Sequence, residues 1–276
     1  MPLSLSNAAI QQFKAQFELN YQAAEKLANT TTTYYNLRGD AFKIPYMGEG
    51  ITTSRGAYQS LIAASDLTIT QKSITFDNWT NNLPLDYFQE KEVQGNTLAS
   101  LSQTHALAMG RRVDQVKIDA LDADPGTSIG DGGTNMSVAK LRETKSAMDD
   151  ANVQGMRYIV MTPNQIDALL ADTSVTSILF NQQRTLVDGN IDTFLGFKFL
   201  SPIGTMAEGG LPKTGNIRSC FAWAEPAIAT GFQIPPNVDV QWSASHQSWL
   251  TISRLRLGAV VTQNAGVIKI DCDETA

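Results

Sequence analysis

The sequence contains few of the side chains that bind metals or form disulfides. Its 276 residues include two cysteines, Cys220 and Cys272, and two histidines, His105 and His246. The cysteines lack CxxC spacing, and a structural zinc ion takes about four ligands. A single disulfide between Cys220 and Cys272 is an alternative to two free thiols, but it is disfavoured in a chain without a secretion signal. We therefore expect no metal, no cofactor and a reducing compartment.

The sequence also lacks a signal peptide, a membrane-spanning run and a basic cluster. The start, MPLSLSNAAIQQF, has no basic region followed by an apolar one. The apolar runs at 158–161 and 257–261 are too short to cross a bilayer. Acidic residues outnumber basic ones by 27 to 21, and the densest basic spot is the pair Arg111 and Arg112. A protein that grips nucleic acid needs more basic charge on one surface, so we expect a soluble protein without sequence-specific nucleic-acid binding.

One short motif resembles a catalytic one, but its surroundings are wrong. Residues 126–130, GTSIG, match the G-x-S-x-G pattern of a nucleophile elbow, and His246 lies downstream as in an α/β-hydrolase. That elbow needs a buried strand before the serine and a helix directly after it. Here Asp122-Ala123-Asp124-Pro125 precedes the motif, and Asp131-Gly132-Gly133 follows it. A serine hydrolase using Ser128 and His246 is therefore the disfavoured alternative, and we expect no catalytic residue.

Two more features of the sequence have ordinary structural interpretations. The carboxylates of Asp122, Asp124 and Asp131 surround the same glycines, but the spacing lacks the glutamate that ends a calcium-binding EF-hand loop. A solvated loop over 124–135 is the better interpretation. His105 lies among apolar residues in a predicted helix, where a hydrogen-bonded core histidine is expected.

The longest predicted element is a helix over 96–121. Its apolar side chains recur at steps of three and four, which is typical of a helix with one buried face. This stripe consists of Leu98, Leu101, His105, Met109, Val113, Val116 and Ala120. Leu107, Ile118 and Leu121 lie off the stripe, so we expect a second side to be covered. Pro125 disfavours helical backbone at the preceding residue and marks the end. At about 1.5 Å per residue, the helix is roughly 39 Å long.

The first thirty residues predict an amphipathic helix. Its apolar stripe consists of Ile10, Phe13, Phe17, Tyr21, Ala24 and Leu27. An ordinary surface helix is one interpretation of this pattern. The second is an arm that packs on a neighbouring subunit, for which Phe13, Phe17 and Tyr21 are anchors of suitable size.

Residues 30–71 predict an extended excursion with two strands. Apolar and polar residues alternate through Phe42, Ile44 and Tyr46, and they alternate again over 67–70. So long a segment without a core of its own is unusual in a monomer. Its open edges and apolar side chains would promote aggregation unless they were covered. We therefore expect this ribbon to lie on another subunit.

The rest of the chain alternates short strands with two helices, which predicts an α+β fold. Ser137 is the expected cap of a helix over 138–151, and Thr162 and Pro163 are expected to begin a second helix after a buried strand at 158–161. The remaining predicted strands are 73–76, 194–200, 220–223, 238–242, 249–257 and 266–270, with a polar-aromatic connection over 79–88.

The order of these elements resembles the major capsid proteins of tailed bacteriophages, which have the Hong Kong-type capsid fold, and most closely the podovirus-like ones. The resemblance rests on RGDAFKIPYMGEG and DLTITQ, then ALAMGRRVDQVKIDAL, YIVMTPNQIDALLAD, IDTFLGFKFLSPIG, FAWAEPAIATGF and SWLTISRLRLGAVVTQNAGVIKID. It implies an N-terminal arm, an extended E-loop, a P domain that carries a long spine helix, and an A domain. The implied bounds are 1–29 for the arm, 30–72 for the E-loop, 73–125 with 240–259 for the P domain, and 126–239 with 260–276 for the A domain.

The resemblance also implies a function and partners. Subunits would form pentamers and hexamers of an icosahedral head around double-stranded DNA, with portal, scaffolding and cement proteins as partners and the host bacterial cytoplasm as the place of assembly. Its expected interface residues are Phe13, Phe17, Tyr21, Lys43, Tyr46, Met47, Arg55 and Tyr58. Lys43 and Lys72 are near the E-loop, but no motif assigns either of them to a covalent crosslink. An encapsulin-like cellular compartment, which shares the fold, and a monomeric binding module compete with the phage head as interpretations.

Overall fold

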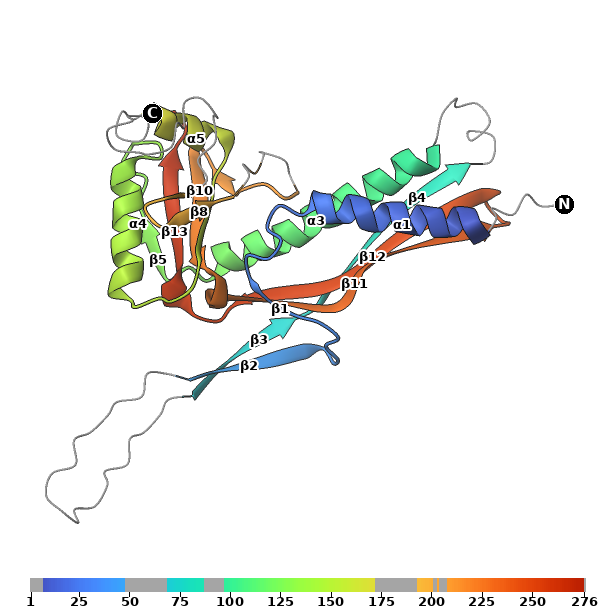
Figure 1. The fold of residues 1–276 in the computed structure, drawn as a ribbon, viewed down its shortest axis with the longest axis horizontal. Coiled ribbons are helices and arrows are strands. Elements are labelled where there is room, and N and C mark those ends of the chain that lie inside the picture. Colours follow the sequence, from blue (N-terminus) through green and yellow to red (C-terminus); the bar gives the residue numbers. More distant parts are fainter. Residues whose placement is uncertain are drawn as a thin grey trace, which may run out of the picture.

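Helix α3 (Thr97–Ala123) runs along the middle of an elongated molecule and contacts both of its large sheets (Figure 1). The computed structural model describes residues 7–47, 69–86, 97–171, 193–200, 203 and 208–275. Met109 and Val113, in the middle of α3, belong to one hydrophobic core, whereas Ile118 and Leu121, near its end, belong to a second core. One helix thus joins two separately packed bodies.

The predicted helix over 96–121 is confirmed, with one error about its surroundings. His105, Met109 and Val113 of the predicted stripe are buried. The covered second side is confirmed for Ile118 and Leu121, which are both 0% exposed. It is wrong for Leu107, which is 39% exposed. At that turn α1 and the four-stranded sheet cover the other sides of α3 and leave the side of Leu107 uncovered.

A four-stranded sheet forms the first body, together with α1 (Asn7–Ala24) and α3. Its order is β1-β11-β12-β4, with β1 parallel to β11 and the remaining neighbours antiparallel. The strands are β1 (Thr32–Tyr34), β11 (Ile228–Ser243), β12 (Ser248–Val261) and β4 (Asp77–Asp86). The inward side chains of β11 and β12 pack against both helices; they include Phe232, Val238, Val240, Trp249, Leu255 and Leu257. A core with its own sheet and two helices therefore forms at this end of the molecule.

Strand β4 corrects the prediction of a connection over 79–88. It pairs with β12 along its whole length, from Asp77 opposite Leu257 to Asp86 opposite Ser248. The strand contains Pro84, which is tolerated because β4 is an edge strand of this sheet, where no further ladder partner needs the missing N–H. The Asn and Thr residues that alternate here with apolar ones give this strand the composition of a loop.

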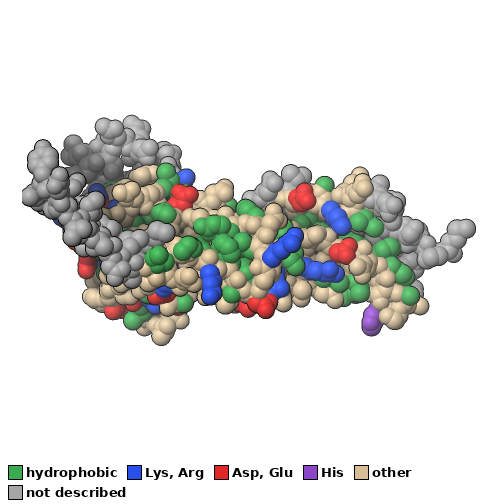
Figure 2. Space-filling model, turned by 90° about the horizontal axis from the view of Figure 1, so that it is seen from below, with side chains coloured by type: hydrophobic (Ala, Val, Ile, Leu, Met, Phe, Trp, Pro, Cys, Tyr) green, Lys and Arg blue, Asp and Glu red, His purple; other side chains and the backbone are tan. Residues whose placement is uncertain are grey.

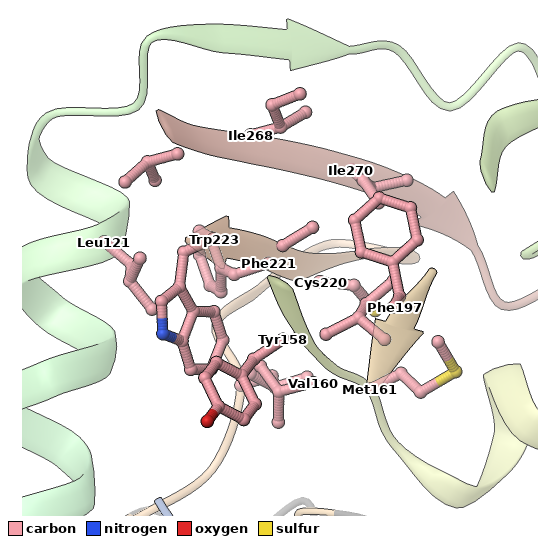
Figure 3. Packing of buried hydrophobic residues seen from close by; sticks show 14 of the residues in the cluster. Leu121, Tyr158, Val160, Met161, Phe197, Cys220, Phe221, Trp223, Ile268 and Ile270 are labelled. Atoms are coloured by element: carbon pink, nitrogen blue, oxygen red, sulfur yellow. The ribbon is translucent and has the colours of Figure 1, made fainter. Parts of the chain in front are cut away.

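A seven-stranded sheet forms the second body. Its order is β5-β13-β10-β6-β8-β7, and β9 pairs with β10 outside this path. The strands are β5 (Thr127–Ile129), β6 (Arg157–Val160), β7 (Thr193–Phe194), β8 (Phe197–Phe199), β9 (Lys213–Thr214), β10 (Ile217–Ala224) and β13 (Val267–Asp273). Helix α4 (Val138–Asp150) covers one face and the end of α3 lies on the opposite one (Figure 1). Figure 3 shows Trp223 and Tyr158 beside Leu121 of α3 in the resulting core.

Most predictions for the second body are confirmed, with two corrections. Ser137 caps α4, and the side chain of Gln165 accepts a hydrogen bond from the backbone N–H of Thr162 at 3.2 Å at the start of α5 (Pro163–Leu170). The strand predicted over 194–200 is instead the hairpin β7–β8, because the left-handed conformations of Leu195 and Gly196 turn the chain. The loop predicted over 124–135 contains β5, which pairs with β13.

The predicted ribbon consists of β2 (Ala41–Met47) and β3 (Ile69–Thr75), which pair in antiparallel register. The strands predicted at 67–70 and 73–76 are largely one strand, β3. The base of the ribbon packs on a small third core around Ile74 and Phe76, and the ribbon then leaves the body (Figure 1). None of the helices in the described residues is long and apolar enough to span a membrane.

Candidate assembly surfaces

The segment that follows α1 is fixed by buried polar contacts to α3. Asp114 on α3 accepts hydrogen bonds from the backbone N–H groups of Lys26, at 2.9 Å, and Leu27, at 3.1 Å. Lys117, one turn later, donates to the carbonyl of Leu27 at 2.8 Å and forms an ion pair with Glu25. Burial raises the pKa of Asp114 to about 6, against the opposing effect of these hydrogen bonds and of Lys117. The contacts hold the chain where it leaves α1.

The next residues extend the same attachment to the sheets. The indole N–H of Trp223 on β10 donates to the carbonyl of Thr30 at 2.9 Å, and the hydroxyls of Thr31 and Thr230 lie 3.0 Å apart. All of these groups are buried, where an unpaired polar atom is costly. Residues 25–31 are therefore tied to α3, β10 and β11 of the same chain.

Phe13 and Phe17 correct the prediction of an arm anchored on a neighbour. They are 3% and 2% exposed and belong to the core that α1 forms with α3 and the four-stranded sheet. The ring of Phe13 meets His105 edge to face, with the centroids 6.5 Å apart. These two side chains therefore pack inside the subunit's own core. The side chain of Tyr21 lies outside the described residues.

His105 is the hydrogen-bonded core histidine that the sequence predicted. Its Nδ1 lies 3.0 Å from the hydroxyl of Ser253, and its Nε2 lies 2.9 Å from the hydroxyl of Thr251. Burial lowers the pKa of His105. The ring therefore connects α3 to β12, and its role is structural.

The two residues of the hydrolase hypothesis are not brought together. Ser128 is exposed on β5, at the edge of the seven-stranded sheet. His246 is exposed in the turn between β11 and β12, at the far end of the four-stranded sheet (Figure 1). A nucleophile and its base must lie within hydrogen-bond reach, so this pair forms no such site.

The carboxylates considered for calcium also have separate partners. Asp122 pairs with Lys269 at 2.8 Å, and Asp124 pairs with Lys72 at 2.6 Å. Asp131 accepts from the backbone N–H of Gly133 at 3.2 Å within its own turn. The three side chains therefore serve different contacts and do not converge on one point.

The ribbon has two different faces, which separate two of the predicted interface residues. Tyr46 shares a half-buried face with Phe42 and Ile44. Lys43 lies on the opposite face, which is exposed, and its cross-strand neighbour there is Ser73. Among the described residues Lys43 has no ion-pair partner. Arg55, Tyr58 and the side chain of Met47 lie outside the described residues.

The outward face of the four-stranded sheet carries half-buried and exposed side chains and has a hollow at one end. This hollow of about 370 Å³ is lined by Asn82, Pro84, Asp86, His246, Ser248 and Leu250. Farther along β12, Arg254 and Arg256 approach Asp239 and Asp40 at 4.0 Å and 3.5 Å. Seen from below, hydrophobic side chains gather in the middle of the molecule, and acidic groups lie among the basic ones (Figure 2). Over the described residues, no uniformly basic surface is visible from this side.

A network around Glu274 was missed in the sequence. Its carboxylate accepts from Arg218 at 2.9 Å, from Gln165 at 3.3 Å and from Lys213. Burial alone would raise the pKa of Glu274, but these hydrogen bonds and the charge of Arg218 lower it to about 2. The contacts tie the end of β13 to α5, β9 and β10. The partners are far apart in sequence, so no local pattern predicts them.

Cys220 and Cys272 are free thiols, as the sequence favoured. They lie on the neighbouring strands β10 and β13, and both are buried. Cys220 is opposite Ile270, and Cys272 is opposite Arg218, so the two cysteines are diagonal neighbours. Their thiols share a hydrogen bond, which together with burial raises the pKa of Cys220.

These features together describe a subunit of a larger structure: a body built on one long helix, a projecting ribbon and no assembled catalytic group among the described residues. The sequence model of the family described as phage capsid protein matches residues 5–274. The chain therefore belongs to the phage capsid protein family. It is a structural subunit that assembles with copies of itself into the icosahedral head of a tailed phage.

Solved structures agree on the fold. The chain is similar to a protein of Mycobacterium phage Che8, with a TM-score of 0.67, 18% identity and coverage of 87% of this chain and 86% of that one. It is similar to a capsid protein of Helicobacter pylori bacteriophage KHP30, with a TM-score of 0.70, 11% identity and coverage of 89% and 88%. A comparison with curated protein sequences found no match.

The hypothesis of a cellular compartment predicts the same fold. The chain is similar to the virus-like particle protein from Pyrococcus furiosus, with a TM-score of 0.64, 8% identity and coverage of 95% of this chain and 98% of that one. At that identity the likeness shows the fold alone. The match to the phage capsid family over nearly the whole chain favours the phage shell.

Proposed function

We propose that each subunit joins its neighbours mainly through the ribbon, and that these contacts build the pentamers and hexamers of a head around double-stranded DNA. The support is the ribbon's position. Lys43, Ser73, Gln71 and Ile69 are exposed on a pair of strands that project from the body. Isolated two-stranded ribbons are marginally stable in water, so a neighbouring surface is the natural cover. A specific contact of this kind buries about 1,000 Å² or more.

The proposed interface residues are Tyr21, Lys43, Tyr46, Met47, Arg55 and Tyr58. Phe13 and Phe17 are excluded because their side chains are used inside the subunit. Several apolar side chains of the body are exposed and available as receiving positions, among them Tyr35 at 63%, Ile234 at 45% and Trp242 at 38%. Tyr35 is stacked on Phe232 at 5.4 Å, so it presents a fixed apolar surface.

We assign the regions as an arm over 1–29, an E-loop over 30–72, a P domain and an A domain. The P domain would comprise 73–125 with 228–261, and the A domain 126–227 with 262–276. We propose a boundary at 228 in place of the expected 240; the support is that β11 lies in the four-stranded sheet along its whole length from Ile228. This division gives each domain one sheet and one main core.

The role we propose is structural throughout, with no catalytic activity. Assembly would take place in the cytoplasm of the host bacterium, with portal and scaffolding proteins and a cement protein as partners. The DNA would be enclosed without sequence-specific contacts, since acidic residues outnumber basic ones by 27 to 21 and the arginines of β12 approach carboxylates.

The family match over residues 5–274 is the observation that carries this proposal. The test is to express the chain and examine it by size-exclusion chromatography and negative-stain electron microscopy. Closed shells are expected. The variant Lys43→Glu should fold, as judged by circular dichroism, and fail to form shells. The matched control is Glu143→Lys, a charge reversal on the exposed face of α4 away from the ribbon, which should still form shells. A wild-type protein that elutes at 30.0 kDa at micromolar concentration would contradict the proposal and favour a monomeric module.

A further inference from the structure

The C-terminal end of α3 carries negative charge that no basic residue of its last turn neutralises. Asp119, Asp122 and Asp124 lie at or just beyond its C-terminal turn, and that turn contains no basic residue. The C-terminus of a helix is its negative end, where acidic side chains are unfavourable and basic ones are favourable. The compensating charges come from different elements. Lys269 of β13 pairs with Asp122, and Lys72 of β3 pairs with Asp124.

Asp124 connects three parts of the molecule through one carboxylate. Its Oδ2 accepts from Lys72 of the ribbon at 2.6 Å. Its Oδ1 accepts from the side chain of Asn264 at 2.6 Å, and Asn264 begins η2 (Asn264–Gly266), which connects β12 of the four-stranded sheet to β13 of the seven-stranded sheet. Asp124 thus links the ribbon to the segment that connects the two bodies.

Lys72 is the outermost attachment of the ribbon to the body among the described residues. Nearer the base, Ile74 is fully buried, and a Cβ on Gly258 would lie 1.9 Å from the carbonyl oxygen of Thr75, so β3 and β12 are in tight contact there. Beyond Lys72, the side chains of Gln71, Thr70 and Ile69 are exposed. The base thus fixes a pivot, and the Lys72–Asp124 pair fixes the direction of the strands beyond it.

We propose that the Lys72–Asp124 ion pair is a latch that holds the ribbon at one angle to the body, and that the ribbon turns about its base when the pair opens. The side chains of the pair are 34% and 43% exposed, so solvent and salt reach both. Exposed ion pairs are individually weak and are screened by salt. Such a pair biases the ribbon toward one orientation and is weak enough to be released by salt or by a competing charge. The consequence for assembly rests on the proposed function: each free subunit would present its ribbon in one direction until a neighbour or the solution breaks the pair.

The test measures the ribbon angle directly in the unassembled subunit. Spin labels are placed on Cys residues introduced by Gln71→Cys, on the exposed ribbon face, and Ser146→Cys, on the exposed face of α4. The distribution of distances between the two labels is recorded by pulsed electron–electron double resonance. Cys220 and Cys272 are 0% exposed, and the chain without the two substitutions serves to confirm that they take up no label. The measurement is made at about 0.1 M and about 1 M salt, where the screening lengths are about 10 Å and about 3 Å.

A single narrow distance is expected at the lower salt concentration, with a shifted or broadened distribution at the higher one. Lys72→Met and Asp124→Asn should each lose the narrow distance at both concentrations, and the double variant should match the single ones because both remove the same pair. Lys43→Met is the matched control for the distance measurement only: it removes a lysine from the opposite face of the same ribbon and should leave the distance distribution of the unassembled subunit unchanged. A narrow, unshifted distance in Lys72→Met would overturn the latch and assign the angle to packing at Ile74 and Gly258.

The outcome is independent of the proposed function. Negative-stain images of the same variants record separately whether shells form. Subunits with the expected distances that form no shells would contradict the assembly proposal and leave the latch intact. Shells formed by a subunit whose ribbon angle ignores Lys72 would do the reverse.

Discussion

The substitution Phe17→Ala distinguishes a core residue from an interface residue. Phe17 is 2% exposed in the core between α1, α3 and the four-stranded sheet. A buried phenylalanine removes roughly 150–250 Å² from water, which at about 25 cal/mol per Å² corresponds to about 4–6 kcal/mol. Phe→Ala substitutions in cores cost about 3–5 kcal/mol. We therefore expect the free energy of unfolding of the subunit to fall by about 3–5 kcal/mol, and Tm to fall by about 6–20 °C.

The assay is urea denaturation of the unassembled subunit, followed by circular dichroism. Gln16→Ala is the matched control because Gln16 precedes Phe17 on α1 and is exposed. This control should lie within about 0.5 kcal/mol of the wild type. The reasoning would be refuted by a Phe17→Ala subunit of wild-type stability that no longer assembles, since that result would place the ring on a neighbouring subunit.

Three further predictions concern the rest of the framework. The pKa of Glu274 is lowered to about 2 from about 4.3 in an unfolded chain, so the ionised carboxylate stabilises the fold above about pH 4.3, and this stabilisation is lost as the pH falls toward 2. The difference in unfolding free energy between the wild type and Glu274→Gln should therefore be largest near pH 7 and shrink toward pH 3 in urea titrations. A difference that does not change with pH would contradict the network. His105→Leu should cost about 1–3 kcal/mol, because it removes the partner of two buried hydroxyls; the same urea assay, with the exposed Gln103→Leu as control, should show no comparable loss in the control. Gly258→Ala places a methyl group against the carbonyl oxygen of Thr75 and should destabilise the subunit by about 1–3 kcal/mol, whereas Gly130→Ala, where a Cβ meets no atom within 4 Å, should change the thermal midpoint little.

Local patterns were sufficient for the elements whose signals lie within a few residues. The spacing of apolar residues predicted α3 within two residues of its ends, and Ser137, Thr162 and Pro163 predicted the starts of α4 and α5. Strand β4 was missed because polar residues on the solvent side of an edge strand resemble a loop. The β7–β8 hairpin was missed because its turn depends on a left-handed Leu195, a conformation that leucine rarely adopts.

The assembly surfaces were less predictable, because one pattern fits two different partners. The stripe of α1 specifies that Phe13 and Phe17 are covered, and it is silent about whether the cover comes from the same chain or from another. The register of β2 with β3 places Lys43 and Tyr46 on opposite faces of the ribbon. The alternation alone does not specify which of these two faces meets the body.

The sequence by itself determined the family, the α+β class and the long central helix, since each depends on the order and periodicity of residues along the chain. Only the tertiary structure decided that α1 is packed on its own subunit, that β11 lies wholly in the four-stranded sheet, and that Asp124 connects the ribbon to the junction of the two bodies. The physical reason is the range of the interactions. Helix periodicity and capping act over three or four residues, whereas the contacts of Asp114 with Leu27, Glu274 with Arg218 and Lys72 with Asp124 join residues 87, 56 and 52 positions apart.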